Sequence, residues 1–395
     1  METLERLLGI DLSVETAERV TATVAGLVEQ KQETERKEAF CPDEPKFPEP
    51  IAVSPTEVGI VAADGGYVRI RNQEEQSEFK AGVLGTMVPV PGVPLIHPET
   101  GKKRSLPPMK DKVYLAHLEK VDDFFEHLTV EYFRRGLHRC SVVQFLADGA
   151  GCYWNRFSDL VQPGQTAIYT LDYYHGMDYV RDAAEAVFGK SRPKTERVPQ
   201  VTESVNPSAS AANVLSDLKP RLVIPFCEGT LEPKEDTVQP RQREHRPEQM
   251  TKPEEGTLSR KWYDKMGGHL LEGRLDEFFD ELKAQQVKSA GQRDKDDPVS
   301  VALNYFEERR HLLTYKECIE RGLPIGSGMV EGGIRFVAKD RLDRPGTKWT
   351  KQGAEAILQL RSLDASKRWP AFFDNVALER RARYQQSKGV WLHAA

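Results

Sequence analysis

Apolar residues recur at helical spacing in residues 13 to 32, with Ser13 placed to cap the N-terminus of a helix. Charged residues and closely spaced prolines follow in residues 33 to 57, and because prolines exclude regular structure we expect a linker there. Three short apolar segments come next and predict strands, at residues 57 to 63, 67 to 71 and 79 to 89.

The sequence Asp64-Gly65-Gly66 separates the first two of these strands. Asp-Gly and Gly-Gly pairs favour tight hairpin turns, because such turns need residues with positive φ. We therefore expect a hairpin with its turn at this point. After a loop rich in glycine and proline at residues 90 to 108, apolar spacing predicts a long helix over residues 112 to 138.

Two later apolar runs, residues 141 to 147 and 166 to 171, are continuous rather than alternating, as in strands covered on both faces. Helical periodicity surrounds these runs and dominates from residue 258 onward. The predicted helices cover residues 153 to 160, 176 to 188, 270 to 286, 299 to 320, 329 to 339 and 351 to 366. This order of elements predicts an α/β fold with a mixed sheet flanked by helices.

Composition places the chain among globular proteins, with 39% hydrophobic and 30% charged residues over 395 positions. No apolar run approaches the ~20 residues of a membrane helix, and the N-terminus lacks the pattern of a signal peptide, so we expect a cytoplasmic protein without membrane contact. Five scattered cysteines without a C-x-x-C pair favour reduced thiols over a zinc ribbon or a disulfide framework.

Positive charge gathers near the C-terminus. Residues 335 to 388 contain 13 Lys and Arg against 6 Asp and Glu, a local charge of +7 in a chain whose net charge is -5. Such a run predicts either a face that binds nucleic acid or an ordinary solvated helix surface.

Two apolar strands end in the same way, at Asp64-Gly65 and at Asp148-Gly149. Carboxylates at the ends of neighbouring strands would meet at one edge of the sheet, where they could bind Mg²⁺. The alternative is that each Asp-Gly only forms a turn. A third carboxylate, Glu331, follows the Gly326-Ser327-Gly328 turn by one helical turn, where it could equally serve the helix dipole or solvent.

These motifs together resemble the transposases of bacterial insertion sequences that carry a DDE triad on an RNase H-like core, in the lineage related to Mutator elements. The resemblance rests on AADGGYVRIR (62 to 71), FLADGAGCYW (145 to 154), LDYYH (171 to 175) and the stretch GLPIGSGMVEGGIRFVAKDRLDRPGTKWTKQGAEAILQLRS (322 to 362). It extends from about residue 10 to residue 370, interrupted at 190 to 257, and the last block is the most specific.

The resemblance implies that Asp64 is the first-strand acid, Asp148 the fourth-strand acid and Glu331 the acid on the last catalytic helix. Together they would hold two Mg²⁺ ions, for which Mn²⁺ would substitute, and catalyse cleavage and strand transfer of DNA. Asp172 and His175 match the D-x-x-H signature of the lineage, so His175 would orient a phosphate, although a structural histidine is the alternative.

The basic C-terminal run would contact the phosphates of DNA. The residues chosen for this role are Arg335, Lys339, Arg341, Arg344, Lys348 and Lys351. Trp349 would stack on a base or sugar, with ordinary packing as the alternative. The expected partners are the ends of the element, target DNA and further copies of the chain on DNA, in the nucleoid of a prokaryote.

The resemblance also divides the chain. Residues 1 to 56 form an N-terminal helix and linker, 57 to 189 the first part of the core, 190 to 320 a mostly helical insertion, and 321 to 395 the completion of the core with a basic helical end. Within the insertion, Glu228 to Gly256 combines four prolines with mixed charge, which predicts a disordered loop that proteases cut first. Two other functions stay open: an inactive or domesticated DNA-binding relic, and an RNase H-like nuclease without strand transfer.

Overall fold

The computed structural model describes residues 13–73, 76–92, 106–189, 252–288, 297–326, 328–344 and 346–393, without the side chains of 329–331 and 386–393. The chain divides into two compact units. The first combines Met1–Tyr173 with Arg309–Ala395, and the second is Tyr174–Glu308. The second unit therefore begins at helix α5, sixteen residues before the insertion expected to start at residue 190.

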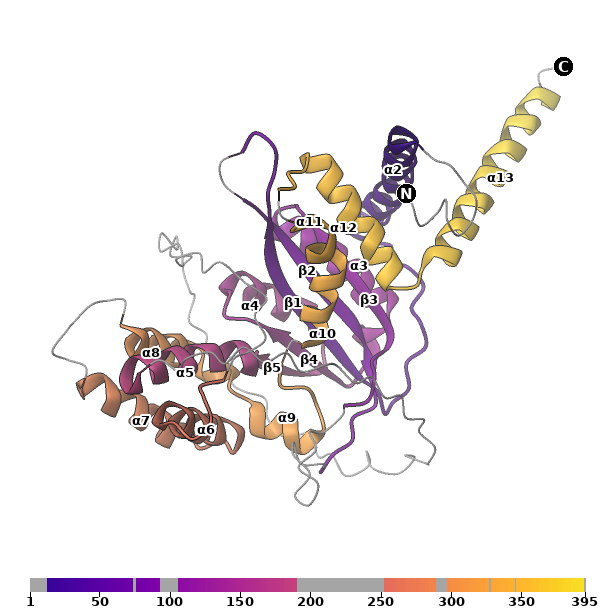
Figure 1. The fold of residues 1–395 in the computed structure, drawn as a ribbon. Helices are drawn as coiled ribbons and strands as arrows, with labels where there is room; N and C mark the ends of the chain where they lie inside the picture. The colour runs from indigo at the N-terminus through magenta and orange to yellow at the C-terminus, as the bar shows by residue number, and fades with distance from the viewer. Residues whose placement is uncertain are drawn as a thin grey trace. The chain divides into compact units, whose positions relative to one another are not determined.

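A five-stranded mixed sheet forms the centre of the first unit (Figure 1). Its strands are β1 (Val58–Val68), β2 (Ser77–Met87), β3 (Lys110–His117), β4 (Val142–Ala147) and β5 (Thr166–Leu171). They lie in the order β3-β2-β1-β4-β5, where β1, β4 and β5 run parallel and β2 is antiparallel to both of its neighbours. The expected α/β class with a mixed sheet and a helical C-terminus is confirmed.

The helices of the first unit are α2 (Val14–Ala39), α3 (Val121–Arg134), η1 (Leu137–Arg139), α4 (Gly151–Phe157), η2 (Ser158–Leu160), η3 (Arg310–Leu312), α9 (Tyr315–Arg321), α10 (Gly328–Ile334), the π-helix η4 (Arg335–Lys339), α11 (Asp340–Leu342), α12 (Lys351–Ala365) and α13 (Trp369–His393). Those of the second unit are α5 (Tyr173–Phe188), α6 (Leu258–Leu271), α7 (Leu275–Lys288) and α8 (Pro298–Glu308). No helix among the described residues is both long enough and apolar enough to span a bilayer.

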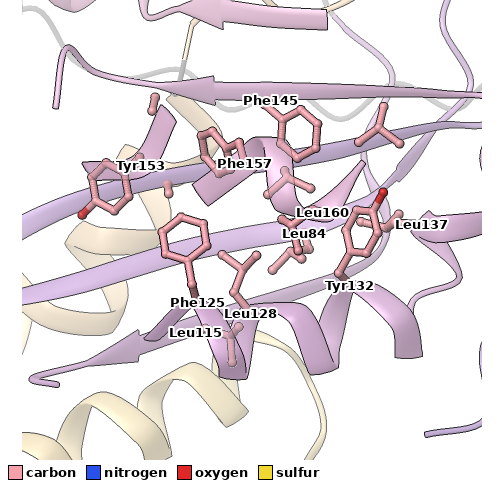
Figure 2. Packing of buried hydrophobic residues seen from close by; sticks show 14 of the residues in the cluster. Leu84, Leu115, Phe125, Leu128, Tyr132, Leu137, Phe145, Tyr153, Phe157 and Leu160 are labelled. Carbon is pink, nitrogen blue, oxygen red and sulfur yellow. The ribbon is translucent and has the colours of Figure 1, made fainter. Parts of the chain in front are cut away.

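Helices cover the sheet on both faces. On one face, α3 contacts β2 and β3, and α4 contacts β4. Figure 2 shows the aromatic core of this face, where Phe125 of α3 lies against Tyr153 and Phe157 of α4, and Phe157 packs on Phe145 of β4. On the other face, α10 packs on β1 and β2, and α12 packs on β3. Burial of both faces is why the strands β4 and β5 are mostly apolar, with Gln144 and Thr170 as buried polar exceptions that bond to each other.

The second unit has a core of its own, built from aromatic side chains. Phe278 of α7 packs edge-on against Phe306 of α8, with ring centroids 4.9 Å apart. Tyr179 of α5 stacks on Tyr305 of α8 at 4.1 Å. These contacts join helices on both sides of the segment 190–251, which lies outside the described residues and contains most of the predicted disordered loop.

The predicted hairpin turn at Asp64-Gly65-Gly66 is wrong. All three residues lie inside β1, where they pair with Ala81, Lys80 and Phe79 of β2. A Cβ atom on Gly66 would overlap the Phe79 ring, so the glycine serves cross-strand packing instead of a turn. The ladder between β1 and β2 satisfies more backbone groups than a turn at this point could. The segment 67 to 71 consequently adds no separate strand beyond the end of β1.

The helix predicted over residues 112 to 138 is also wrong in its first third, which is strand β3. Leu115 and Leu118 have the spacing of a helix, but Val113 and Leu115 alternate inward as in a strand and pair with Leu84 and Gly82 of β2. The helix begins only at Val121. Short apolar runs fit both periods, so hydrogen bonding to β2 decides between them.

Other boundaries change less. Helix α2 continues to Ala39, so the first seven residues of the expected linker are helical. Ser13 caps this helix as predicted, accepting a hydrogen bond from the Thr16 N–H at 3.1 Å. Three of the expected helices are divided or altered: 270 to 286 begins in α6 and continues in α7, 299 to 320 becomes α8, η3 and α9, and 329 to 339 ends as a π-helix. The helices over 153 to 160, 176 to 188 and 351 to 366 are confirmed within a few residues.

Candidate functional site

Asp64 and Asp148 lie on adjacent strands at one end of the sheet. Ala63 of β1 pairs in parallel with Ala147 of β4, and the next residue of each strand is the aspartate. The parallel register therefore makes Asp64, inside β1, and Asp148, directly after β4, neighbours in space although they are 84 residues apart in the chain. This part of the predicted site is present in the structure.

The sheet register also decides which face these carboxylates occupy. Asp64 pairs with Ala81, and Ala81 pairs with Ala116 of β3, so these three side chains share a face. Tyr114, two residues before Ala116, lies on the same face and packs against α10. A Cβ atom on Gly333 of α10 would overlap the Tyr114 ring, which means that only glycine permits this close approach. Asp64 therefore lies on the face of the sheet that α10 covers.

The Asp64 carboxyl is in a strongly unfavourable position for a negative charge. Burial raises its pKa to about 8, and the charge of Asp148 adds to the increase. Asp172 raises it further, whereas the hydrogen bond from the Gly65 N–H, at 2.7 Å, and the charge of Lys339 act in the opposite direction. A site that concentrates negative charge in this way favours a bound cation.

Asp172 is the member of this group that the sequence analysis did not place among the acids. It follows β5 directly, and its N–H donates to the Ala147 carbonyl at 2.9 Å, next to Asp148. Its side chain is 1% exposed. The sequence contains a signal for it, because the apolar run of β5 is followed directly by an aspartate, as the run of β4 is.

The loop that carries Asp148 is held by its neighbours. Trp154 Nε1 donates to the Asp148 carbonyl at 2.9 Å, and Asp148 Oδ1 accepts from the Ala150 N–H at 3.1 Å. The guanidinium of Arg309 donates twice to the Gly149 carbonyl, at 2.8 and 3.0 Å. No pattern in the sequence marked Arg309, because it acts through a backbone carbonyl 160 residues away.

Tyr153 places a buried hydroxyl beside these acids. Its oxygen has no hydrogen-bond partner among the described residues and would lie 3.3 Å from a Cβ atom on Gly65. Burial raises the pKa of Tyr153, and the charge of Asp64 raises it further, so the group stays a neutral donor. Gly65 follows Asp64 in β1 and therefore faces the opposite side of the sheet, so the Tyr153 hydroxyl lies on the side that α3 and α4 cover.

For the other two predicted catalytic residues, Glu331 and His175, the structure does not show whether they approach the aspartates. The backbone of Glu331 lies in α10, on the face that carries Asp64, while its side chain is outside the described residues. His175 belongs to the second unit, where its ring contacts Tyr179 and Tyr305. The convergence of Glu331 on the aspartates and the catalytic role of His175 therefore stay predictions.

The basic residues predicted to contact DNA follow α10 in the chain. Lys339 is half-buried and close enough to lower the pKa of Asp64, which links the basic run to the acids. Arg335 lies 3.6 Å from Asp340 Oδ1, and Arg344 donates to the Asp340 carbonyl at 2.9 Å. The exposed members of the set are Arg335, Arg341, Arg344, Lys348 and Lys351.

Trp349 has a packing role in this structure. Its Nε1 donates to the Leu342 carbonyl at 3.2 Å, and the Arg341 guanidinium lies over its ring, 5.1 Å from the centroid. Its backbone pairs with Arg69 and Arg71, just beyond β1, at 3.0 and 2.7 Å. This is the alternative that the sequence left open, and stacking on a nucleotide stays untested.

A second set of metal-binding side chains lies elsewhere in the first unit. Among the described side chains, one group of three offers ligand atoms all within 4.8 Å of one another: His117, Glu119 and His127. These residues could hold a metal ion. The sequence analysis missed them, because they are scattered over a strand, a turn and a helix without the spacing of a known metal motif.

The raised pKa of Asp64 predicts a pH dependence of stability. Between the ordinary pKa of 3.8 and about 8, the folded state binds more protons than the unfolded state, so stability falls as pH rises through this range. In Asp64→Asn this fall should flatten, and without divalent ions the variant should melt higher at pH 8, by roughly 2–4 °C for each kcal/mol gained. Thermal melts from pH 5 to 8 in chelator would measure this.

The control for this prediction is Asp374→Asn, which removes an exposed carboxylate on α13. It should follow the wild type at every pH. An equal pH dependence in wild type and Asp64→Asn would contradict the placement of Asp64 among negative charges.

Comparison of the chain with protein-family models and with curated proteins finds no match. What this site does must therefore be argued from its own chemistry: clustered carboxylates at the edge of a mixed sheet, a helix carrying a further glutamate on the same face, and a basic run that follows it.

Proposed function

We propose that the chain is a DDE transposase that cleaves DNA at the ends of an insertion sequence and joins them to a target. The observation that carries the proposal is the position of Asp64 in β1 and of Asp148 directly after the parallel neighbour β4. The resemblance assigns these two residues to a first and a fourth strand, and β1 and β4 pair in parallel in the sheet. The two aspartates are neighbours in the sheet although their strands are far apart in the sequence.

The proposal includes an RNase H-like core. It is supported by the mixed sheet, with three parallel strands and an antiparallel β2, and by the helix α10 packed on β1 and β2. In this interpretation Glu331, whose backbone lies in α10, would supply the third carboxylate, and the second unit would be the helical insertion between the fifth strand and the helix that carries the third acid. His175 would then orient a phosphate.

The residues present fit divalent ions. Asp64 and Asp148 provide the oxygen ligands that Mg²⁺ prefers, and their repulsion, visible in the raised pKa of Asp64, would be relieved by a bound cation. Two Mg²⁺ ions, or Mn²⁺ in their place, would activate the attacking water or 3′-hydroxyl and stabilise the leaving oxygen of an in-line displacement.

Other residues of the chain would position the two aspartates and contact the DNA. The sheet fixes the spacing of the two aspartates, and Trp154 and Arg309 hold the loop that carries Asp148. Lys339 brings a positive charge near Asp64, where a DNA phosphate would approach. The exposed basic residues that follow would neutralise further phosphates and give binding its affinity.

The direct test uses purified full-length chain, labelled DNA carrying the ends of the element that encodes it, and Mg²⁺ or Mn²⁺. We expect metal-dependent nicks at the ends and products joined to a target plasmid. Nicking without joined products would indicate an RNase H-like nuclease. Binding of the ends without any cleavage in either metal would indicate a DNA-binding relic and contradict the proposal.

The basic run provides a second prediction. In the double variant Arg341→Ala, Arg344→Ala, DNA affinity should fall for all sequences alike, because two phosphate contacts are lost. The slope of log affinity against log salt should decrease by about one for each lost contact. Fluorescence anisotropy of labelled duplex over a series of salt concentrations would measure it.

The matched control is Arg380→Ala, Arg383→Ala on α13, two exposed arginines that are not among the residues chosen for phosphate contact, with the same change in net charge. It should leave the slope close to that of the wild type. An unchanged slope in the Arg341 and Arg344 variant would assign the basic run to ordinary solvated surface.

A further inference from the structure

The cluster of His117, Glu119 and His127 lies apart from the carboxylates of the proposed active site. His117 ends β3 and pairs with Lys80 of β2, which in turn pairs with Gly65 of β1. Two strand spacings, or about 10 Å, therefore separate His117 from the strand that carries Asp64. The two histidines are buried, at 1% and 6% exposure, although histidine is polar.

We propose that these three side chains bind one divalent transition-metal ion of the zinc class. Two imidazoles and one carboxylate form a donor set that suits zinc and similar ions better than Mg²⁺, which prefers oxygen ligands alone. Water would complete a tetrahedral site. This proposal is independent of the transposase function, because it uses none of the same residues.

One distance in the cluster already fits such an ion, and all three ligand atoms lie within 4.8 Å of one another. A tetrahedral zinc with bonds of 2.0–2.1 Å holds its ligand atoms about 3.4 Å apart. Glu119 Oε2 lies 3.4 Å from His127 Nε2. The same oxygen is buried and makes no hydrogen bond to the described residues, which is the state expected of an atom that lacks its ligand.

A second carboxylate orients one of the histidines. Glu355 of α12 contacts His117 Nδ1 at 2.9 Å and also accepts from the Leu118 N–H at 2.7 Å. The two oxygens of a carboxylate only accept hydrogen bonds, and one of them already accepts from the Leu118 N–H. His117 Nδ1 must then be the donor. In the neutral ring this leaves Nε2 with the lone pair that binds metal.

Binding requires a small rearrangement of the rings. The imidazoles of His117 and His127 are parallel within 6°, with centroids 4.7 Å apart. Two parallel rings cannot direct their in-plane lone pairs at one ion, so one ring must turn about its Cβ–Cγ bond, a torsion with a broad range in histidine. The bound ion would join β3, α3 and, through Glu355, α12.

The test is titration of chelator-treated full chain with Co²⁺, whose visible absorption bands report tetrahedral nitrogen and oxygen ligands, followed by displacement with Zn²⁺. We expect one equivalent of Co²⁺ with these bands in the wild type. Glu119→Gln should lose the bands and bind at least tenfold more weakly. Because the Glu119 side chain is 40% exposed, this variant should keep its fold, which circular dichroism would verify.

Three further variants sharpen the result. Glu355→Gln should retain the bands but weaken binding by about 10–100-fold, as expected of a residue that orients a ligand. Glu126→Gln removes the carboxylate next to His127 without touching the cluster and should match the wild type. Asp148→Asn should also match it, which separates this site from the proposed active site. A wild type without tetrahedral bands, or a Glu119→Gln variant indistinguishable from it, would overturn the proposal.

Discussion

Asp148→Asn is expected to abolish DNA cleavage while leaving DNA binding close to that of the wild type. Asparagine keeps the shape of the side chain but removes the negative charge that would hold a divalent ion between β4 and β1. We expect the cleavage rate to fall by at least about 10²–10³-fold, the range seen when one electrostatic element of an active site is lost. Affinity should stay similar or rise slightly, because one repulsion of phosphate disappears.

Cleavage of labelled ends and anisotropy binding, measured on the same preparation, would check both halves of this prediction. The control is Asp159→Asn in η2, the short helix that follows α4. The side chain of Asp159 is 64% exposed. It should cleave at the wild-type rate. Cleavage by Asp148→Asn at the same rate as this control would remove Asp148 from the catalytic site.

Glu131→Gln should cause the largest loss of stability, about 3–5 kcal/mol, because it removes the carboxylate that pairs with the buried Arg135 and with Arg368. The Glu131 carboxylate on α3 is 5% exposed and accepts from Arg368, just before α13, at 2.7 Å. Burial alone would raise its pKa, but three guanidinium groups around it lower the pKa to about 2. They belong to Arg134, Arg368 and Arg135.

The lowered pKa gives this prediction a pH signature. The stabilisation is complete above the ordinary pKa of 4.5 and is lost as pH falls from 4.5 toward about 2. Denaturant unfolding of the variant should therefore differ most from that of the wild type near neutral pH, and the difference should shrink in acid. A constant difference at all pH values would show that shape, and not charge, explains the loss.

Glu379→Gln is the matched control for this stability measurement. Glu379 pairs with Arg383 on the surface of α13 at 3.4 Å, and its side chain is 55% exposed. Exposed ion pairs within one helix contribute about 0.3–0.5 kcal/mol, so the variant should unfold almost as the wild type does. An equal loss in both variants would contradict the importance of burial around Glu131.

Long periodic elements could be predicted from the sequence, and short ones could not. The helices near α5 and α12 and the strands β4 and β5 were found because their apolar residues extend over enough positions to select one period. Strand β3 falls inside the predicted helix because Leu115 and Leu118 have helical spacing, whereas Val113 and Leu115 have the spacing of a strand. Its identity depends on hydrogen bonds to β2, which local spacing does not contain.

The candidate site, too, was predictable where it depends on local sequence and not where it depends on strand pairing. Sequence alone determined that an aspartate follows an apolar run at Asp64 and at Asp148, because such runs can be identified without knowledge of the fold. Only the tertiary structure decided that β1 lies beside β4 and that Asp64 lies within a strand instead of a turn. It also decided that Asp172 is close enough for its charge to raise the pKa of Asp64. The cluster of His117, Glu119 and His127 is wholly tertiary, since it forms where a strand end, a turn and a helix meet. The sequence specifies which side chains are present, but strand pairing and helix packing determine which of them lie close together.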